Sequence, residues 1–184
     1  MYHDSFDLFC KYLPLNASIL DIACGPGNVS KYLLDNRPDI NLLGIDLSAN
    51  MLQLARNNNP SGIFKEMDCR EINSLERKFD GIMCAFALPY LNKQEAVDLI
   101  ISAAELLPPN GILYISTMEG DYETSGFQRS SAGDEIFINL YGEKYLSKAL
   151  LENDFYKIQI DRKISFQLDK SKVMDLIITA FKRE

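Results

Sequence analysis

Short apolar runs rich in isoleucine, leucine and valine alternate along the chain with segments whose apolar residues recur at helical spacing. The apolar runs predict strands at about residues 18–23, 40–46, 62–67, 79–85 and 111–117. The helical spacing predicts helices at about residues 27–36, 48–57 and 92–107. Runs such as 19–23 and 81–85 are apolar at consecutive positions, as in strands that are covered on both faces. This alternation predicts an α/β fold in which helices flank a mostly parallel sheet.

The two ends of the chain are less regular than its middle. A short helix from Ser5 to Leu13 is expected near the start. Residues 118–141 lack periodicity, and a segment of that length is commonly a functional loop or insertion. The pattern then resumes, with a predicted helix and two predicted strands at about residues 142–152, 155–166 and 172–182. We expect a single domain over residues 1–184, because this length suits one hydrophobic core.

Composition narrows the classes of function. Hydrophobic residues make up 47% of the chain and charged residues 24%, a mixture typical of a folded, soluble domain. The net charge of −7 argues against nucleic acid as a partner, because nucleic-acid binders neutralise phosphates with lysine and arginine. No apolar run approaches the roughly 20 residues that span a bilayer, so no membrane partner is expected. The start of the sequence lacks the pattern of a secretion signal, so we expect a cytoplasmic location.

The four cysteines, Cys10, Cys24, Cys69 and Cys84, are widely separated in the sequence. They lack the paired spacing of zinc ligands or of a redox couple, so we expect free thiols in a reducing compartment and no metal. The single histidine, His3, lies near the start of the chain. Neither the cysteines nor His3 therefore indicates a catalytic residue.

The most informative segment joins a predicted strand to a helix through a glycine turn. Asp21 lies near the end of the strand at 18–23, and Gly25 and Gly27 follow it. Glycine permits a tight turn against which a ligand can lie, and such turns bind cofactors at the carboxyl ends of parallel strands. Ser30 occupies the position of the third glycine of a dinucleotide-binding loop. The negative charge of Asp21 favours a cationic ligand over a pyrophosphate. The simpler alternative is that this segment binds no ligand and is a glycine turn with a capping aspartate.

Two further aspartates follow the next predicted strands. Asp46 lies 19 residues after Gly27, close to the ~20-residue spacing of a carboxylate that binds ribose hydroxyl groups. The alternative for Asp46 is an acid near the N-terminus of a helix, beside Ser48. Asp68 follows the strand at 62–67, where a carboxylate can accept a hydrogen bond from an adenine amino group. In isolation, a surface turn explains Asp68 nearly as well.

Taken in order, these three sites resemble the class I, seven-strand S-adenosylmethionine-dependent methyltransferases. The resemblance is strongest to the small-molecule branch that includes the quinone-biosynthesis methyltransferases. The matching segments are 20–27, 44–52, 67–68, 79–88 and 107–113. Their combined order, over residues 18–117, is strongly specific. The sequence departs from the family at Ala23 and Asn110, where many members have glycine.

The resemblance implies S-adenosylmethionine as the cofactor and a binding role for each matched residue. Asp21 would lie near the amino group of the cofactor, Asp46 would bind its ribose, and Asp68 would read its adenine edge. The remaining contacts would come from Ala23, Cys24, Gly25, Gly27, Leu47, Met51, Cys69 and the carbonyl of Cys84.

The resemblance also implies the architecture. We expect a doubly wound, three-layer αβα sandwich with strand order 3-2-1-4-5-7-6 and an antiparallel strand 7. Residues 1–18 would form a short lid over the cofactor, or a neighbouring subunit of a homodimer would complete that lid. Residues 118–141 would form a loop or insertion on the substrate side.

These inferences predict methyl transfer from S-adenosylmethionine to a small, partly apolar acceptor. Residues 85–91 offer apolar walls in place of the Asn-Pro-Pro-Tyr-type motif of enzymes that methylate nucleobases or amides. Methyl transfer depends mainly on positioning, and a general base is needed only if the acceptor must lose a proton. The alternatives are a nicotinamide-dependent oxidoreductase with a Rossmann-like fold and a non-catalytic protein that binds S-adenosylmethionine.

Overall fold

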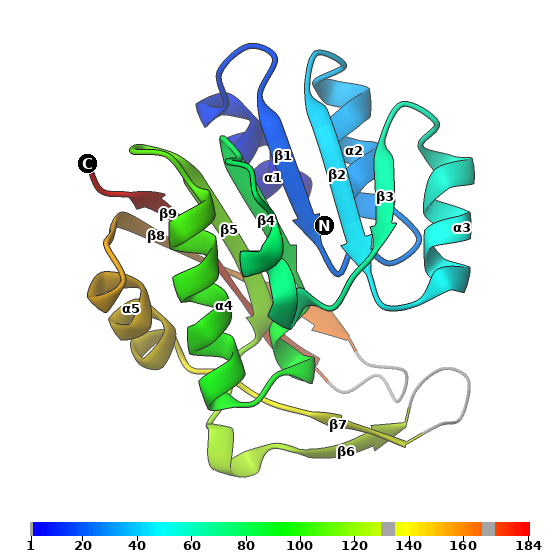
Figure 1. The fold of residues 1–184 in the computed structure, drawn as a ribbon. Helices are drawn as coiled ribbons and strands as arrows, with labels where there is room; N and C mark the ends of the chain where they lie inside the picture. Colours follow the sequence, from blue (N-terminus) through cyan, green and yellow to red (C-terminus); the bar gives the residue numbers. More distant parts are fainter. Residues whose placement is uncertain (1, 130–134, 167–171) are drawn as a thin grey trace.

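A sheet of seven strands runs through the centre of the molecule, with helices on both of its faces (Figure 1). The structure is a computed structural model and describes residues 2–129, 135–166 and 172–184. The strands of the sheet are β1 (Ser18–Ile22), β2 (Asn41–Asp46), β3 (Ile63–Glu66), β4 (Gly81–Ala85), β5 (Ile112–Met118), β8 (Phe155–Phe166) and β9 (Lys172–Lys182). Their order is β3-β2-β1-β4-β5-β9-β8, and β9 runs antiparallel to both of its neighbours. The predicted strand order is confirmed.

The sheet divides the hydrophobic core into two buried clusters, and helices cover one cluster on each face. One face carries α1 (His3–Tyr12), α2 (Asn28–Asn36) and α3 (Ala49–Asn58), and the other carries α4 (Lys93–Leu106) and α5 (Glu143–Glu152) (Figure 1). Leu33 and Leu52 belong to the cluster on the first face, whereas Ile100 and Leu146 belong to the cluster on the second. This is the predicted three-layer sandwich. Within the described residues, no helix combines the length and hydrophobicity that crossing a bilayer requires.

Side-chain caps determine where two of these helices begin. The Ser48 hydroxyl accepts a hydrogen bond from the Met51 amide at the N-terminus of α3. At the N-terminus of α4, the Asn92 side chain accepts from the Glu95 amide, and the Glu95 carboxylate accepts from the Asn92 amide. Such caps satisfy amides that a helix otherwise leaves without partners. Because α3 follows β2 and α4 follows β4, both helices begin at the carboxyl edge of the parallel strands.

Residues 118–141, expected to be a loop or insertion, contain a small antiparallel hairpin. Its strands are β6 (Gly126–Arg129) and β7 (Glu135–Ile138), and residues 130–134 lie outside the described part of the chain. Just after β7, the Asn139 amide donates a 2.8 Å hydrogen bond to the carbonyl of Pro89. The hairpin is therefore attached to the segment that follows β4.

The N-terminal helix forms part of the core. Phe6 and Phe9 of α1 are buried against the sheet. Next to the first turn of α1, the Tyr2 hydroxyl donates a 2.6 Å hydrogen bond to the buried carboxylate of Asp175 on β9. A lid formed by residues 1–18 stays a prediction. Residue 1 lies outside the described residues.

Candidate functional site

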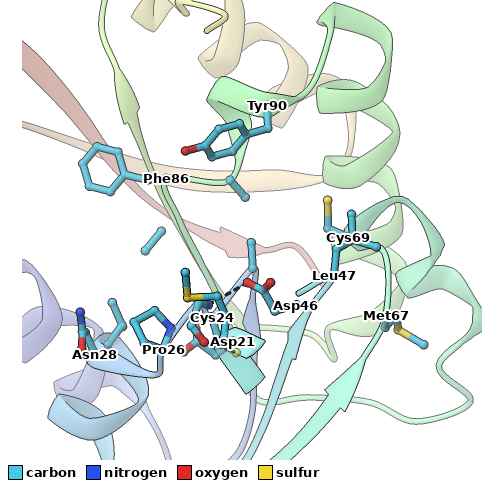
Figure 2. Close-up of a pocket in the computed structure, with 16 residues that line it drawn as sticks. Asp21, Cys24, Pro26, Asn28, Asp46, Leu47, Met67, Cys69, Phe86 and Tyr90 are labelled. Carbon is cyan, nitrogen blue, oxygen red and sulfur yellow. Dashed lines mark hydrogen bonds between the residues drawn. The ribbon is translucent and has the colours of Figure 1, made fainter. Parts of the chain in front are cut away.

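A cavity of about 510 Å³ opens at the carboxyl edge of the sheet, where β1, β2 and β4 end (Figure 2). Parallel α/β sheets bind ligands at this edge. The residues that line the cavity are Asp21, Ala23, Cys24, Gly25, Pro26, Asn28, Val29, Asp46, Leu47, Met51, Met67, Cys69, Ala85, Phe86, Ala87 and Tyr90. Most of them are apolar, and the only two with formal charges are aspartates.

Asp21 lies in β1 and has only 1% of its surface exposed. The Ser30 hydroxyl, on α2, donates a 2.5 Å hydrogen bond to Oδ2 of Asp21. Burial raises the pKa of Asp21 to about 7, the hydrogen bond from Ser30 opposes this shift, and the nearby charge of Asp46 adds to it. A positive charge bound beside Asp21 would favour its ionised form. Near neutral pH, this carboxyl can therefore respond to a cationic ligand.

Asp46 holds together two segments that border the cavity. Its Oδ2 accepts a 2.8 Å hydrogen bond from the Gly25 amide (Figure 2). Its Oδ1 accepts a 2.8 Å hydrogen bond from the Ser48 amide. Each carboxylate oxygen has a second lone pair. Asp46 can therefore position the glycine turn and still accept hydrogen bonds from a ligand.

The turn after β1 has a backbone that few residue types tolerate. Ala23, Gly25 and Gly27 have φ angles of +52°, +53° and +79°. A β-carbon on Gly25 would meet no atom within 4 Å, whereas one on Gly27 would lie 2.4 Å from Nδ2 of Asn59. Gly25 therefore faces open space at the cavity, while Gly27 allows the turn to pack against the end of α3.

Eight of the eleven residues predicted to bind a cofactor converge on this cavity: Asp21, Ala23, Cys24, Gly25, Asp46, Leu47, Met51 and Cys69. Gly27, Asp68 and Cys84 do not line it. Cys84 is completely buried on β4, and Gly27 packs against α3. The convergence is a property of the structure, while the cofactor-binding roles stay a prediction.

The side chain of Asp68 binds Arg70 and does not line the cavity. Its carboxylate accepts hydrogen bonds from Nε and Nη2 of Arg70, at 3.0 and 2.5 Å. These hydrogen bonds hold the pKa of Asp68 below its usual range. Arg70 also forms a 3.1 Å ion pair with Glu95 on α4. The Asp68 side chain therefore joins the segment after β3 to α4, and its neighbours Met67 and Cys69 line the cavity instead.

The cysteines at this edge of the sheet carry protonated thiols near neutral pH. Burial raises the pKa of Cys69 to about 11 and raises those of Cys24 and Cys84 as well. A protonated thiol is a weak nucleophile and a weak metal ligand. In the described part of the chain, no group of three or more His, Cys, Asp or Glu residues could hold a metal ion.

The segment after β4 forms one wall of the cavity, with a backbone conformation that was not predicted from the sequence. Figure 2 shows Phe86 and Tyr90 on the side of the cavity opposite Pro26. Phe86 has a φ angle of +57°, which is uncommon for a bulky residue, and its amide donates a 2.9 Å hydrogen bond to the Ser116 carbonyl. The apolar residues 85–91 predicted apolar walls, but no motif indicated this backbone conformation.

The start of α2 differs from that of a dinucleotide-binding loop. In that loop, a glycine-rich turn brings a pyrophosphate to the N-terminus of the helix. Here Ser30 replaces the third glycine, is completely buried and donates its hydroxyl to Asp21. Ionised Asp21 would also repel a pyrophosphate at this cavity. The arrangement therefore disfavours the nicotinamide alternative.

Comparison with known proteins decides the family. A family model described as a methyltransferase domain matches residues 19–111, about half of the 184-residue chain. The chain belongs to the methyltransferase-domain family. The matched segment contains all of β1 except Ser18, β2 to β4, the glycine turn and both cavity aspartates. The family predicted from the sequence is confirmed.

Two curated relatives of this methyltransferase domain are named for different methyl acceptors. The dTDP-3-amino-3,6-dideoxy-alpha-D-glucopyranose N,N-dimethyltransferase of Streptomyces fradiae is 34% identical over 108 residues, covering 57% of this chain and 41% of the relative. The malonyl-(acyl-carrier protein) O-methyltransferase of Enterobacter lignolyticus is 28% identical over 151 residues, covering 81% of this chain and 57% of the relative. The chain spans about half the length of these relatives.

A solved structure supports the fold over nearly the whole chain. It is described as a SAM-dependent methyltransferase from Methanosarcina mazei and has a TM-score of 0.80. The match covers 96% of this chain and 97% of that chain at 22% identity. This likeness extends the agreement in fold beyond residues 19–111, to α5 and the last two strands of the sheet.

Proposed function

We propose that this methyltransferase domain binds S-adenosylmethionine in the cavity and transfers its methyl group to a small, partly apolar acceptor. The observation that carries the proposal is the position of Asp21 and Asp46, on neighbouring parallel strands beside one largely apolar cavity. S-adenosylmethionine combines an ammonium, a carboxylate, a sulfonium, ribose hydroxyl groups and a flat base. The ammonium, the sulfonium and the hydroxyl groups match the two neighbouring aspartates, and the base matches the apolar walls.

Asp21 supports binding of the positively charged end of the cofactor. Its carboxyl is buried, accepts one hydrogen bond from Ser30 and has a pKa of about 7. A cation beside it would ionise Asp21 and form a charge-assisted interaction in a site of low polarity. Gly25 would let the same end of the ligand lie against the turn, since no atom lies within 4 Å of its missing β-carbon.

Asp46 and the start of α3 support binding of the nucleoside. The free lone pairs of Asp46 would accept hydrogen bonds from the two ribose hydroxyl groups. Leu47 and Met51 border the same part of the cavity with 62% and 41% of their surfaces exposed, although both side chains are large and apolar. An adenine ring packed against them would remove this apolar surface from water. Met67 and Cys69 would border the same ring.

The reaction requires positioning more than acid–base chemistry. When bound, S-adenosylmethionine supplies a methyl group activated by its sulfonium; the acceptor lone pair bonds to the methyl carbon, and the carbon–sulfur electrons pass to sulfur. The residues of this chain hold the two reactants in line and exclude water. Phe86, Ala87 and Tyr90 would form the apolar wall on the acceptor side.

The small, partly apolar acceptor is supported by the lining of the cavity and by one of the two relatives. The relative from Streptomyces fradiae is named for a nucleotide-linked amino sugar, and the one from Enterobacter lignolyticus for a malonyl group on a carrier protein. The walls of this cavity are largely apolar, and the chain is acidic overall, with a net charge of −7. The cytoplasmic location and a homodimer stay predictions of the sequence.

A labelled-methyl experiment tests the proposal. The protein is incubated with methyl-labelled S-adenosylmethionine and a heat-treated cell extract that ultrafiltration has divided into small molecules and macromolecules. We expect label to enter the small-molecule fraction and S-adenosylhomocysteine to accumulate, both far more slowly with Asp46→Ala. Transfer confined to the macromolecular fraction would contradict the small acceptor. Binding of the cofactor with no transfer to either fraction would favour the non-catalytic alternative.

A further inference from the structure

A second cavity, of about 450 Å³, adjoins the first beside the beginning of α1. Four residues line both cavities: Asn28, Val29, Ala85 and Phe86. The second cavity is also lined by six residues that take no part in the proposed cofactor site: Tyr2, His3, Phe6, Lys31, Tyr32 and Asp35. A ligand in the second cavity would therefore lie next to one in the first.

Five of the ten residues that line this second cavity carry aromatic rings, and we call it the aromatic cavity. Tyr2 lies edge-on to Phe86, with their ring centroids 5.5 Å apart. The His3 and Tyr32 rings stack at 4.5 Å, and Phe6 lies 5.5 Å from Tyr32. Rings at these distances gain energy from each other, and their planes, inclined at 29° to 66°, offer both ring faces and ring edges to a ligand. The aromatic cavity is therefore pre-formed for another flat ring.

Three polar side chains around the aromatic cavity, those of Lys31, Tyr32 and Asp35, have partners within the protein. Lys31 and Asp35 form an exposed ion pair at 2.9 Å on α2, so each charge already has a counter-charge. The Tyr32 hydroxyl donates a 2.7 Å hydrogen bond to Asp7. A charged ligand would leave water without gaining a free counter-charge from this ion pair, whereas an uncharged ring avoids that cost.

Phe86 connects the two cavities through an unusual backbone conformation. Its φ angle of +57° is unfavourable for a bulky side chain, and strain of this kind is found most often at functional sites. The conformation places Phe86 in the walls of both cavities and against the ring of Tyr2. An acceptor ring held on this side would contact Phe86 while its reacting group faced the cofactor cavity.

We infer that the aromatic cavity binds an uncharged aromatic ring, and that this ring belongs to the methyl acceptor. The first part rests on the walls of the aromatic cavity, and the second rests on the proposed methyl transfer. Tyr32 is the best position for a test, because it lines the aromatic cavity and not the cofactor cavity.

The experiment measures binding of three probes that share one ring system and differ in charge: 2-naphthol, 2-naphthoate and 2-naphthylmethylammonium. Each is titrated by calorimetry into the protein with and without S-adenosylhomocysteine. The variants are Tyr32→Leu, which removes the ring, and Tyr32→Phe, which keeps the ring and loses the hydrogen bond to Asp7. Tyr12→Leu is the matched control, because Tyr12 is an exposed tyrosine at the far end of α1.

We expect 2-naphthol to bind more tightly than either charged probe. Tyr32→Leu should weaken its binding by about 3- to 10-fold, the effect of losing one aromatic contact. Tyr32→Phe and Tyr12→Leu should bind 2-naphthol as the wild type does, and all three variants should bind S-adenosylhomocysteine normally. Absent 2-naphthol binding, equal binding by Tyr32→Leu, or tighter binding of a charged probe would overturn the inference. Tyr32-dependent binding in a protein that does not bind S-adenosylhomocysteine would support the aromatic cavity and contradict the proposed function.

Discussion

The hydroxyl of Ser30 lies 2.5 Å from Oδ2 of Asp21, and both residues are buried where β1 meets α2. This hydrogen bond satisfies one oxygen of a carboxyl that burial makes costly to ionise. Ser30 also occupies the position of the third glycine in a dinucleotide-binding loop. A glycine there would have no hydroxyl to donate to Asp21. The pair therefore distinguishes this cavity from a pyrophosphate site.

Asp21→Asn tests whether the buried carboxyl destabilises the free protein. The folded-state pKa of Asp21, about 7, lies above the value of about 4 expected when unfolded. The wild type should therefore lose stability from this group as pH rises from about 4 to about 7, at up to ~1.4 kcal/mol per pH unit. Asparagine does not titrate, so the stability of Asp21→Asn relative to the wild type should increase across this window. Urea unfolding at several pH values measures the difference, and parallel curves would refute the assignment.

The same carboxyl should make cofactor binding depend on pH. If a cation binds beside Asp21, binding favours the ionised form, so affinity should rise as pH increases through about 7. Between pH 6 and pH 8, we expect S-adenosylhomocysteine to bind several-fold more tightly at the higher pH. Asp21→Asn should bind more weakly and lose this dependence. Calorimetry at both pH values makes the comparison, and an unchanged pH profile in the variant would exclude Asp21 as the group responsible.

Asp46→Ala should weaken cofactor binding much more than it perturbs the fold. Each charge-assisted hydrogen bond to a ribose hydroxyl is worth on the order of 1.5–3 kcal/mol, so losing both should lower affinity by about 100-fold or more. Stability should also fall by roughly 1–2 kcal/mol, because the Gly25 and Ser48 amides lose their acceptor. Asp35→Ala, which removes an exposed ion pair with Lys31, is the control. Unchanged affinity in a folded Asp46→Ala protein would refute the ribose assignment.

Gly27→Ala should destabilise the protein without touching the cavity wall. The new β-carbon would lie 2.4 Å from Nδ2 of Asn59, at a residue with φ +79°. Overpacking costs about 1–3 kcal/mol and left-handed backbone about 1–2 kcal/mol more, so thermal unfolding should occur at a clearly lower temperature. Gly126→Ala is the matched control, because its β-carbon would meet no atom within 4 Å. Equal melting temperatures for the two variants would contradict this packing role.

Thiol alkylation reports on occupation of the cavity. Cys69 is half-buried and lines the cavity, whereas Cys10, Cys24 and Cys84 are buried. We expect iodoacetamide to modify Cys69 first, slowly because burial raises its pKa to about 11, and more slowly still with S-adenosylhomocysteine present. Peptide mass spectrometry after timed quenching measures the rates. Modification of Cys69 at the same rate with and without bound ligand would place the ligand elsewhere.

Much of the fold could be predicted because local patterns agree with the final packing. Strands β1 and β4 are apolar at consecutive positions, as burial on both faces requires, and the caps at Ser48 and Asn92 mark helix starts. Even the glycine preference of the family at two positions has a visible cause. Ala23 and Asn110 have φ angles of +52° and +64°, which glycine adopts more easily.

The parts of the site that could not be predicted depend on contacts distant in the sequence. Gly27 packs against Asn59, 32 residues away. Arg70, which binds the Asp68 carboxylate, also forms an ion pair with Glu95 on α4. The backbone of Phe86 depends on a hydrogen bond to Ser116 in the neighbouring strand. Spacing along the chain carries no signal for such pairs.

Calorimetric titration with S-adenosylhomocysteine and, separately, with NAD tests the central claim most directly. The account predicts saturable binding of S-adenosylhomocysteine that Asp46→Ala largely abolishes, and no detectable binding of NAD. At a ligand concentration of 100 times the dissociation constant, the bound cofactor should add about 2.7 kcal/mol to stability, which a matching rise in melting temperature would corroborate. Binding of NAD by a protein that does not bind S-adenosylhomocysteine would contradict the account.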